Sequence, residues 1–198
     1  MKQAHHDLDD ATLRFNLWLT QVVVIGVALF GSLFVHGWAG TLDLFRLPAP
    51  GAFLWAILVA ALVVGSSIVM DRFLPRSWQD DGSINERIFT GLSIGRTVIL
   101  CCLIGFGEEW LFRGVIQAFI GNLWTSVFFT LVHVRYLSKP LLVGSVFVTS
   151  WLLGWLLEAS GCLLPSILAH IVIDLLLALY IQHGCSVRGG TWNDTGRE

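Results

Sequence analysis

Long apolar runs constrain the fold of this chain more than any other feature of its sequence. Residues 51–70, GAFLWAILVAALVVGSSIVM, contain no ionisable side chain, and residues 15–36 form a second long apolar run. A helix needs about 20 apolar residues to cross the roughly 30 Å hydrocarbon core of a bilayer. With 55% hydrophobic and 13% charged residues, the chain also lacks the charged surface of a soluble domain. The sequence therefore predicts an all-α, polytopic membrane helix bundle.

Six apolar segments are predicted to form the transmembrane helices. They cover residues 15–36, 51–70, 96–120, 123–134, 141–157 and 162–181. Gly121-Asn122 separates the third segment from the fourth, which is short for a span. No internal repeat or second domain is evident.

The basic residues between these segments predict the orientation of the chain. If the N-terminus is inside, the outer loops hold a single basic residue, Arg46. The inner segments then hold Lys2, Arg14, Arg72, Arg76, Arg87, Arg96, Arg135, Lys139, Arg188 and Arg197. By the positive-inside rule, both termini are expected in the cytoplasm. The net charge of −2 gives no indication of a nucleic-acid partner.

Ionisable side chains inside the apolar segments carry the strongest indication of function. They occur in GFGEEWLFRG (residues 105–114), FFTLVH (128–133) and ILAHIVIDLL (167–176). They are Glu108, Glu109, Arg113, His133, His170 and Asp174. A charge at the bilayer centre costs on the order of 3 kcal/mol by insertion scales. Such groups therefore pair, face the protein interior or line a cavity.

Helical spacing pairs Glu109 with Arg113, because residues four apart share one face of a helix. Glu108 diverges from its neighbour by about 100° and has no partner on its own helix. A carboxylate without an ion pair in an apolar setting is suited to act as a general base near neutral pH. Two structural interpretations stay open, namely an ion pair that holds helices together and a carboxyl group that donates to a carbonyl.

The two histidines have helical neighbours of their own. His170 and Asp174 are four residues apart and can form a hydrogen bond that fixes the tautomer of the imidazole. Phe129 and His133 share the corresponding face of the fourth segment. Each histidine taken singly is also compatible with a satisfied core residue. Together with Glu108, they can activate a water and stabilise the oxyanion of a hydrolysed carbonyl, which predicts an intramembrane hydrolase.

Three motifs resemble those of a known family. EEWLFRG resembles the EExxxR motif of the CPBP family, the CAAX proteases and bacteriocin-processing enzymes, also called type II CAAX prenyl endopeptidase-like proteins. FTLVH resembles its FxxxH motif, and HIVID resembles its HxxxN or HxxxD motif, in the same order. The resemblance covers roughly residues 91–181. It implies a glutamate-dependent intramembrane endopeptidase that cleaves a membrane-anchored protein or peptide.

The resemblance also implies a role for each site residue. Glu108 and His133 would activate the water, and His170 and Asp174 would bind the developing oxyanion. The supporting residues would be Glu109, Arg113 and Phe129. Many members of the family have asparagine at the last motif position, and an ionised aspartate cannot donate a hydrogen bond as asparagine does. Asp174 is then either protonated or orients His170, and we favour the second.

The resemblance leaves the metal requirement to be tested. Glu108, His133 and His170 would supply three ligands and leave an open position for a zinc ion. The sequence has no HExxH motif, so a metal-free mechanism without a cofactor is favoured and zinc is the alternative. The expected parts are N-terminal helices with a cytoplasmic loop (1–90), a catalytic helical core (91–182) and a polar tail (183–198).

Other functions are compatible with parts of the pattern. A non-catalytic membrane regulator or immunity protein is the main alternative, and intact motifs argue against it. A proton-coupled transporter also uses buried Glu, His and Arg, but the chain lacks a repeat. No GxSG turn of a rhomboid serine protease is present, and a GxGD aspartyl protease would need a second aspartate in a span. The short chain favours a prokaryotic protein of the inner or plasma membrane, with the lipid bilayer and a membrane-anchored substrate as partners.

Overall fold

The chain is helical along the part that the structure describes. The computed structural model describes residues 9–75, 78 and 83–189, with the helix alone for 185–189. The elements are α1 (Asp10–Asp43), α2 (Pro50–Phe73), α3 (Ile84–Phe89), α4 (Ile94–Glu109), the π-helix η2 (Trp110–Ile116), α5 (Gln117–Val132), the 3₁₀-helix η3 (Val134–Tyr136), α6 (Pro140–Ser160) and α7 (Leu164–Gly189). These residues contain no strand, which confirms the all-α prediction.

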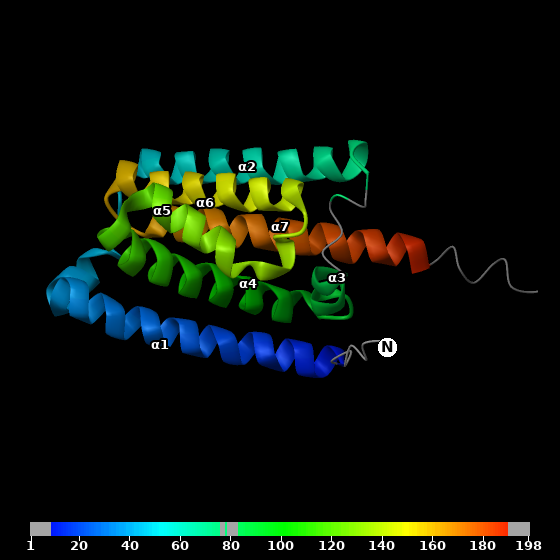
Figure 1. The fold of residues 1–198 in the computed structure, drawn as a ribbon, viewed down its shortest axis with the longest axis horizontal. Helices are drawn as coiled ribbons and strands as arrows, with labels where there is room; N and C mark the ends of the chain where they lie inside the picture. Colours follow the sequence, from blue (N-terminus) through cyan, green and yellow to red (C-terminus); the bar gives the residue numbers. More distant parts are fainter. Residues whose placement is uncertain (1–8, 76–77, 79–82, 190–198) are drawn as a thin grey trace, which may run out of the picture.

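Five helical stretches of the described residues are long and apolar enough to cross a membrane. The third of them, Ile94–Val132, contains both the third and the fourth predicted segments. Gly121 interrupts it with φ +72°, a left-handed conformation that favours glycine. The chain reverses there, so that α4 and the later part of α5 run in opposite directions (Figure 1). Residues 122–132 rise roughly 16 Å, about half the hydrocarbon core, so they return only part of the way across.

The two ends of the helical bundle carry different connections. The beginning of α1 and the end of α7 lie at one end, and the α1–α2 and α6–α7 connections lie at the other (Figure 1). The start of the first helix and the end of the last helix thus lie on the side where the basic residues are concentrated, as the predicted orientation requires. Lys2, Arg76, Arg197 and residues 190–198 of the predicted tail lie outside the described residues.

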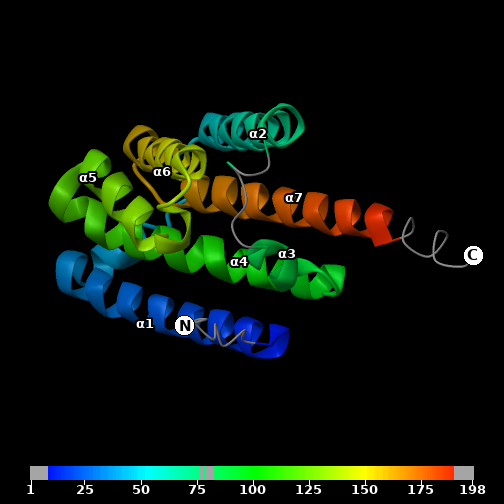
Figure 2. The same cartoon turned by 45° about the vertical axis from the view of Figure 1, so that its right-hand side comes forward.

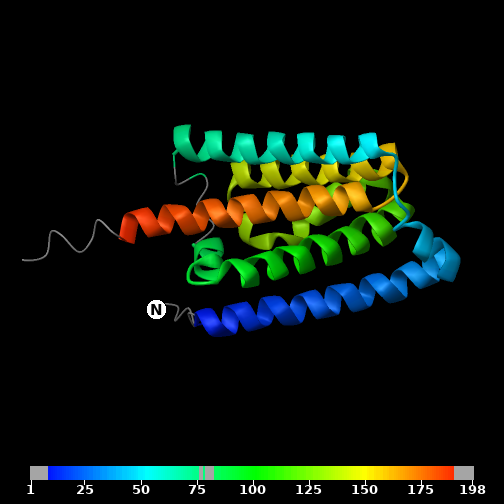
Figure 3. The same ribbon diagram turned by 180° about the vertical axis from the view of Figure 1, so that it is seen from behind.

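Helix α7 is the centre of the bundle. Seen from behind, it runs between α2 and α4, and α1 lies on the far side of α4 (Figure 3). Ala169 and Ile173 of α7 are buried against Val63 of α2, and Ala178 is buried against Leu100 of α4. Any side chain that α7 directs towards α4 is therefore held inside the protein, whatever surrounds the bundle.

The short helix α3 was not predicted, because it lies in the polar loop that follows α2. It sits beside α4 and α7 at the end where α1 begins (Figure 2). Arg14 of α1 holds it, since its guanidinium donates to the carbonyls of Ile88 at 2.9 Å and Thr90 at 2.6 Å. A second link joins Arg87 to Asp10 at 2.8 Å. The loop between α2 and α4 is thereby fixed over one end of the bundle.

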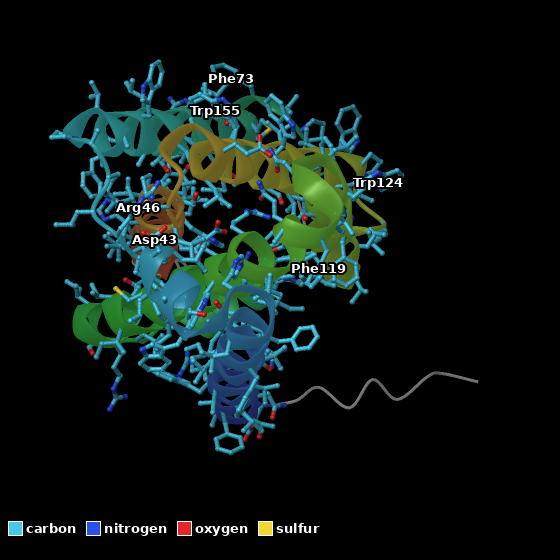
Figure 4. The ribbon with its side chains drawn as sticks, turned by 90° about the vertical axis from the view of Figure 1, so that its left-hand side faces the viewer. Asp43, Arg46, Phe73, Phe119, Trp124 and Trp155 are labelled. Atoms are coloured by element: carbon cyan, nitrogen blue, oxygen red, sulfur yellow. The ribbon has the colours of Figure 1, made fainter. Side chains whose placement is uncertain are left out.

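The opposite end is drawn in Figure 4. Asp43 and Arg46 form an exposed ion pair of 3.3 Å in the α1–α2 connection. Phe119 and Trp124, on either side of the Gly121 reversal, project outwards and are 65% and 63% exposed. Large aromatic side chains on the outside of a helix bundle fit contact with lipid rather than water.

Replacing Gly105 with alanine is expected to separate α4 from α7. A Cβ at this position would lie 2.7 Å from Ile171 Cγ1 and 3.0 Å from its backbone nitrogen. Close approach through small residues is how membrane helices pack, and overpacking costs about 1–3 kcal/mol. The measurement is thermal unfolding of Gly105→Ala in detergent micelles. Gly65→Ala is the control, since nothing lies within 4 Å of its Cβ; equal melting temperatures would contradict the packing argument.

Candidate active site

A cavity of about 560 Å³ lies inside the bundle and is bordered by all of its long helices, by α3 and by the end of α5. Most of the side chains around it are apolar. The four residues that the sequence proposes as catalytic all line it, namely Glu108, His133, His170 and Asp174. Three separate helical segments thus bring their ionisable groups to one cavity.

Glu108 reaches this cavity from the end of α4. Among the described residues, no hydrogen bond or ion pair involves its carboxylate. Its neighbour Glu109 is fully buried and points away from it, into the packing between α4, η2 and α7. Because adjacent residues of a helix point in different directions, Glu109 is buried in an ion pair and Glu108 lines the cavity.

Glu109 bridges two basic side chains rather than one. Its Oε2 lies 3.2 Å from Arg113 Nε, the contact that helical spacing predicts. Its Oε1 lies 2.9 Å from His170 Nδ1 on α7, a contact between helices that the sequence does not reveal. Arg113 is itself buried and donates from Nη2 to Ser150 Oγ of α6 at 3.0 Å. This carboxylate therefore links the EExxxR segment to the HxxxD segment.

His170 is held from both sides of its ring. A carboxylate can only accept, so Nδ1 carries a proton and donates it to Glu109. Nε2 lies 3.5 Å from Asp174 Oδ2, one helical turn further along α7. Sequence spacing anticipates the Asp174 contact, but the shorter contact is the one with Glu109. The imidazole thus has a fixed orientation, and its Nε2 edge faces Asp174.

His133 is fixed by the backbone at the point where α5 ends. Its Nδ1 lies 2.7 Å from the carbonyl oxygen of Phe129, so Nδ1 carries the proton and the neutral ring keeps a lone pair on Nε2. The Phe129 ring packs against the imidazole with centroids 4.6 Å apart. The guanidinium of Arg113 also lies over the Phe129 ring, 5.3 Å from its centroid. Phe129 therefore orders the histidine and covers the buried ion pair.

The helix changes its winding immediately after the two glutamates. Trp110–Ile116 form a π-helix, which is wider than an α-helix. Such turns are rare in proteins, and those that occur are often found at functional sites. His36 of α1 donates from Nε2 to the carbonyl oxygen of Gly114 in this turn, at 2.7 Å. The geometry of the EExxxR segment is thus supported from the neighbouring helix α1.

The arrangement does not fit a zinc site built from the three predicted ligands. Among the described residues, no three His, Cys, Asp or Glu side chains are placed to hold a metal ion. Both ring nitrogens of His170 already face carboxylates, Glu109 at 2.9 Å and Asp174 at 3.5 Å. With Nδ1–H donated to Glu109, the neutral ring keeps a lone pair on Nε2, so His170 alone could bind zinc; the described residues lack a set of three ligands placed around one point.

The cavity also contains polar residues that the motifs do not include. Gln21 enters it from α1, and Asn85 and Arg135 border it at the end covered by α3. Arg135 donates from Nη2 to Asn85 Oδ1 at 2.9 Å. Arg135 could have been noticed because it follows His133 by two residues in the sequence. Gln21 and Asn85 come from regions outside the motif-bearing segments.

Comparisons with known proteins indicate the family of the chain. Residues 90–176 match the family model described as type II CAAX prenyl endopeptidase Rce1-like. The chain is also similar to the uncharacterized protein YpbD of Bacillus subtilis (strain 168). The two are 37% identical over 166 residues, which cover 83% of this chain and 87% of that protein. No solved structure matches the chain.

Proposed function

The chain belongs to the type II CAAX prenyl endopeptidase Rce1-like family, whose members are membrane proteases, and it is a multi-pass protein of the plasma membrane. From this premise we propose that it is a glutamate-dependent intramembrane endopeptidase. The observation that carries the proposal is the shared cavity, into which Glu108 brings an unpaired carboxylate beside His133 and His170. The alternative of a non-catalytic regulator gives no reason for this convergence.

The proposed reaction is hydrolysis of one peptide bond. Glu108 takes a proton from a water, and the resulting hydroxide attacks the scissile carbonyl carbon. The C–N bond then breaks, and the proton on Glu108 passes to the leaving amine. His133, with Nδ1 held by the Phe129 carbonyl, presents its Nε2 lone pair to the same water. The largely apolar lining of the cavity limits the access of other water to these groups.

His170 is proposed to stabilise the oxyanion. In its doubly protonated form it donates from Nε2, while Nδ1 stays on Glu109. Asp174 lies on the Nε2 side and acts by orienting the ring, as the departure from the family's asparagine suggests. Glu109, Arg113 and Phe129 do not touch substrate in this mechanism; they hold the two histidines.

The substrate is proposed to be a protein or peptide anchored in the membrane. The cavity lies within the bundle and holds only a short stretch of peptide, since pockets of 300–1,000 Å³ suit small ligands. The test uses purified full-length protein in micelles with a library of synthetic peptides, each with an apolar anchor and a randomised polar end. Mass spectrometry should find discrete cleavage products. A folded protein that cleaves none of them would leave the regulator interpretation in place.

Chelation is expected to leave proteolysis unchanged. Since no three His, Cys, Asp or Glu side chains of the described residues are placed to hold a metal ion, the proposed reaction relies on Glu108 as base and needs no metal ion. The measurement is the rate of library cleavage after incubation with an excess of EDTA or phenanthroline. Loss of activity on chelation, followed by its return on adding zinc, would contradict the metal-free mechanism.

A further inference from the structure

Gln21 is a buried polar residue that neither the motifs nor the proposed mechanism uses. It lies on α1, outside the region matched by the family model, and is only 2% exposed. Its Oε1 has no hydrogen-bond partner among the described residues, although the side chain borders the cavity. Leaving a buried polar group unpaired costs about 1–3 kcal/mol, so a ligand in the cavity that hydrogen-bonds to this amide would remove that cost.

Gln21 brings its amide close to the part of α4 that carries the proposed base. Helix α1 lies against α4 (Figure 1), and a Cβ on Gly107 would be 3.4 Å from Gln21 Oε1. Gly107 immediately precedes Glu108, which lines the same cavity. The amide oxygen therefore lies close to α4 one residue before the unpaired carboxylate, and both side chains line the same cavity.

A peptide cleaved at membrane depth needs a group of this kind. Its backbone must leave the helical conformation before a peptide bond becomes accessible, and its N–H and C=O groups then lose their internal partners. Within hydrocarbon each such group costs several kcal/mol, and water is scarce in an apolar cavity. A side-chain amide both donates and accepts, and rotation about its last bond exchanges the two roles.

We propose that Gln21 is a substrate-binding residue whose amide hydrogen-bonds to a backbone peptide group of the unwound substrate, next to the bond that the water activated by Glu108 attacks. The inference rests on the proposed function for the identity of the ligand, a peptide. It adds a binding contact from α1, so the complete site extends beyond residues 90–176.

The test measures binding rather than cleavage, using the Glu108→Gln protein in micelles. The probe is the library peptide that the wild type cleaves fastest or, if none is cleaved, the one that Glu108→Gln binds most tightly. A series of copies replaces one backbone amide at a time with an ester. An ester lacks the N–H and has a weaker carbonyl acceptor, so it weakens the bond whichever way the glutamine lies. Displacement of a fluorescent copy gives each affinity.

One ester position, or two adjacent ones, should weaken binding about five- to tenfold. Adding Gln21→Met should remove this sensitivity, because methionine matches glutamine in length but offers no amide. Gln117→Met is the matched control. Gln117 is also buried and has an unpartnered Oε1, but it lies outside the cavity, so the ester sensitivity should persist.

Three outcomes would overturn the inference. They are the absence of any peptide binding, a flat ester series, and an ester effect that survives Gln21→Met. A melting temperature for each variant shows that the protein remains folded. Failure of the proposed function gives different results: the wild-type protein cleaves no peptide, or the Glu108→Gln protein still cleaves. In either case the affinities of the ester series can still be measured.

Discussion

Glu108→Gln is expected to reduce peptide cleavage by about two to four orders of magnitude while leaving the protein folded. Glutamine has the shape of glutamate but cannot take a proton from water. Because the structure gives Glu108 no ion pair or hydrogen bond among the described residues, its replacement breaks no contact of the bundle. The measurement is the rate of product formation from the peptide library, with the melting temperature in micelles recorded beside it.

Glu158→Gln is the matched control for this substitution. Glu158 is a carboxylate of α6 outside the cavity, and its Oε1 accepts from Gln117 Nε2 at 3.2 Å. A glutamine at this position can still accept that bond, so both cleavage and stability should stay near wild type. Full activity in Glu108→Gln would remove Glu108 from the mechanism, and equal losses in both variants would point to a general effect of altered charge.

The fold was largely predictable because it depends on hydrophobic length, which a single sequence displays directly. The ranges of α2 and α6 differ from the predicted segments by only a few residues, since their apolar runs end in polar or turn residues. The break at Gly121 was visible as Gly-Asn, but whether the chain would reverse there depends on packing between α5 and α6. Helix α3 could not be predicted, because Arg14 of a distant helix stabilises it.

The candidate site was predictable where its contacts follow one helix. Spacing gives Glu109–Arg113 and the proximity of His170 to Asp174, since each pair is one turn apart. The contact between Glu109 and His170 joins residues 61 positions apart, and no periodicity encodes it. The same is true of Gln21, which reaches the cavity because α1 packs against α4. Contacts between helices therefore had to come from the structure.

Arg113→Met is expected to destabilise the protein more than any other single substitution considered, by about 3–5 kcal/mol. Arg113 and Glu109 are both fully enclosed, and methionine would leave the carboxylate with His170 as its one remaining partner. The lost bond to Ser150 adds to the effect. Thermal or denaturant unfolding in micelles measures the change, with exposed Arg46→Met as the control, since its ion pair is at the surface.

The double variant Glu109→Gln with Arg113→Met separates the two parts of this cost. Removing both charges takes away the unpaired carboxylate, so the double variant should recover much of the stability lost in Arg113→Met. Cleavage should not recover with it, because a neutral glutamine no longer holds the protonated His170 as a carboxylate does. If the double variant is as unstable as Arg113→Met, the contribution of Arg113 comes from Ser150 and the Phe129 ring instead. If cleavage returns with stability, the pair holds the helices together and has no part in positioning the histidine.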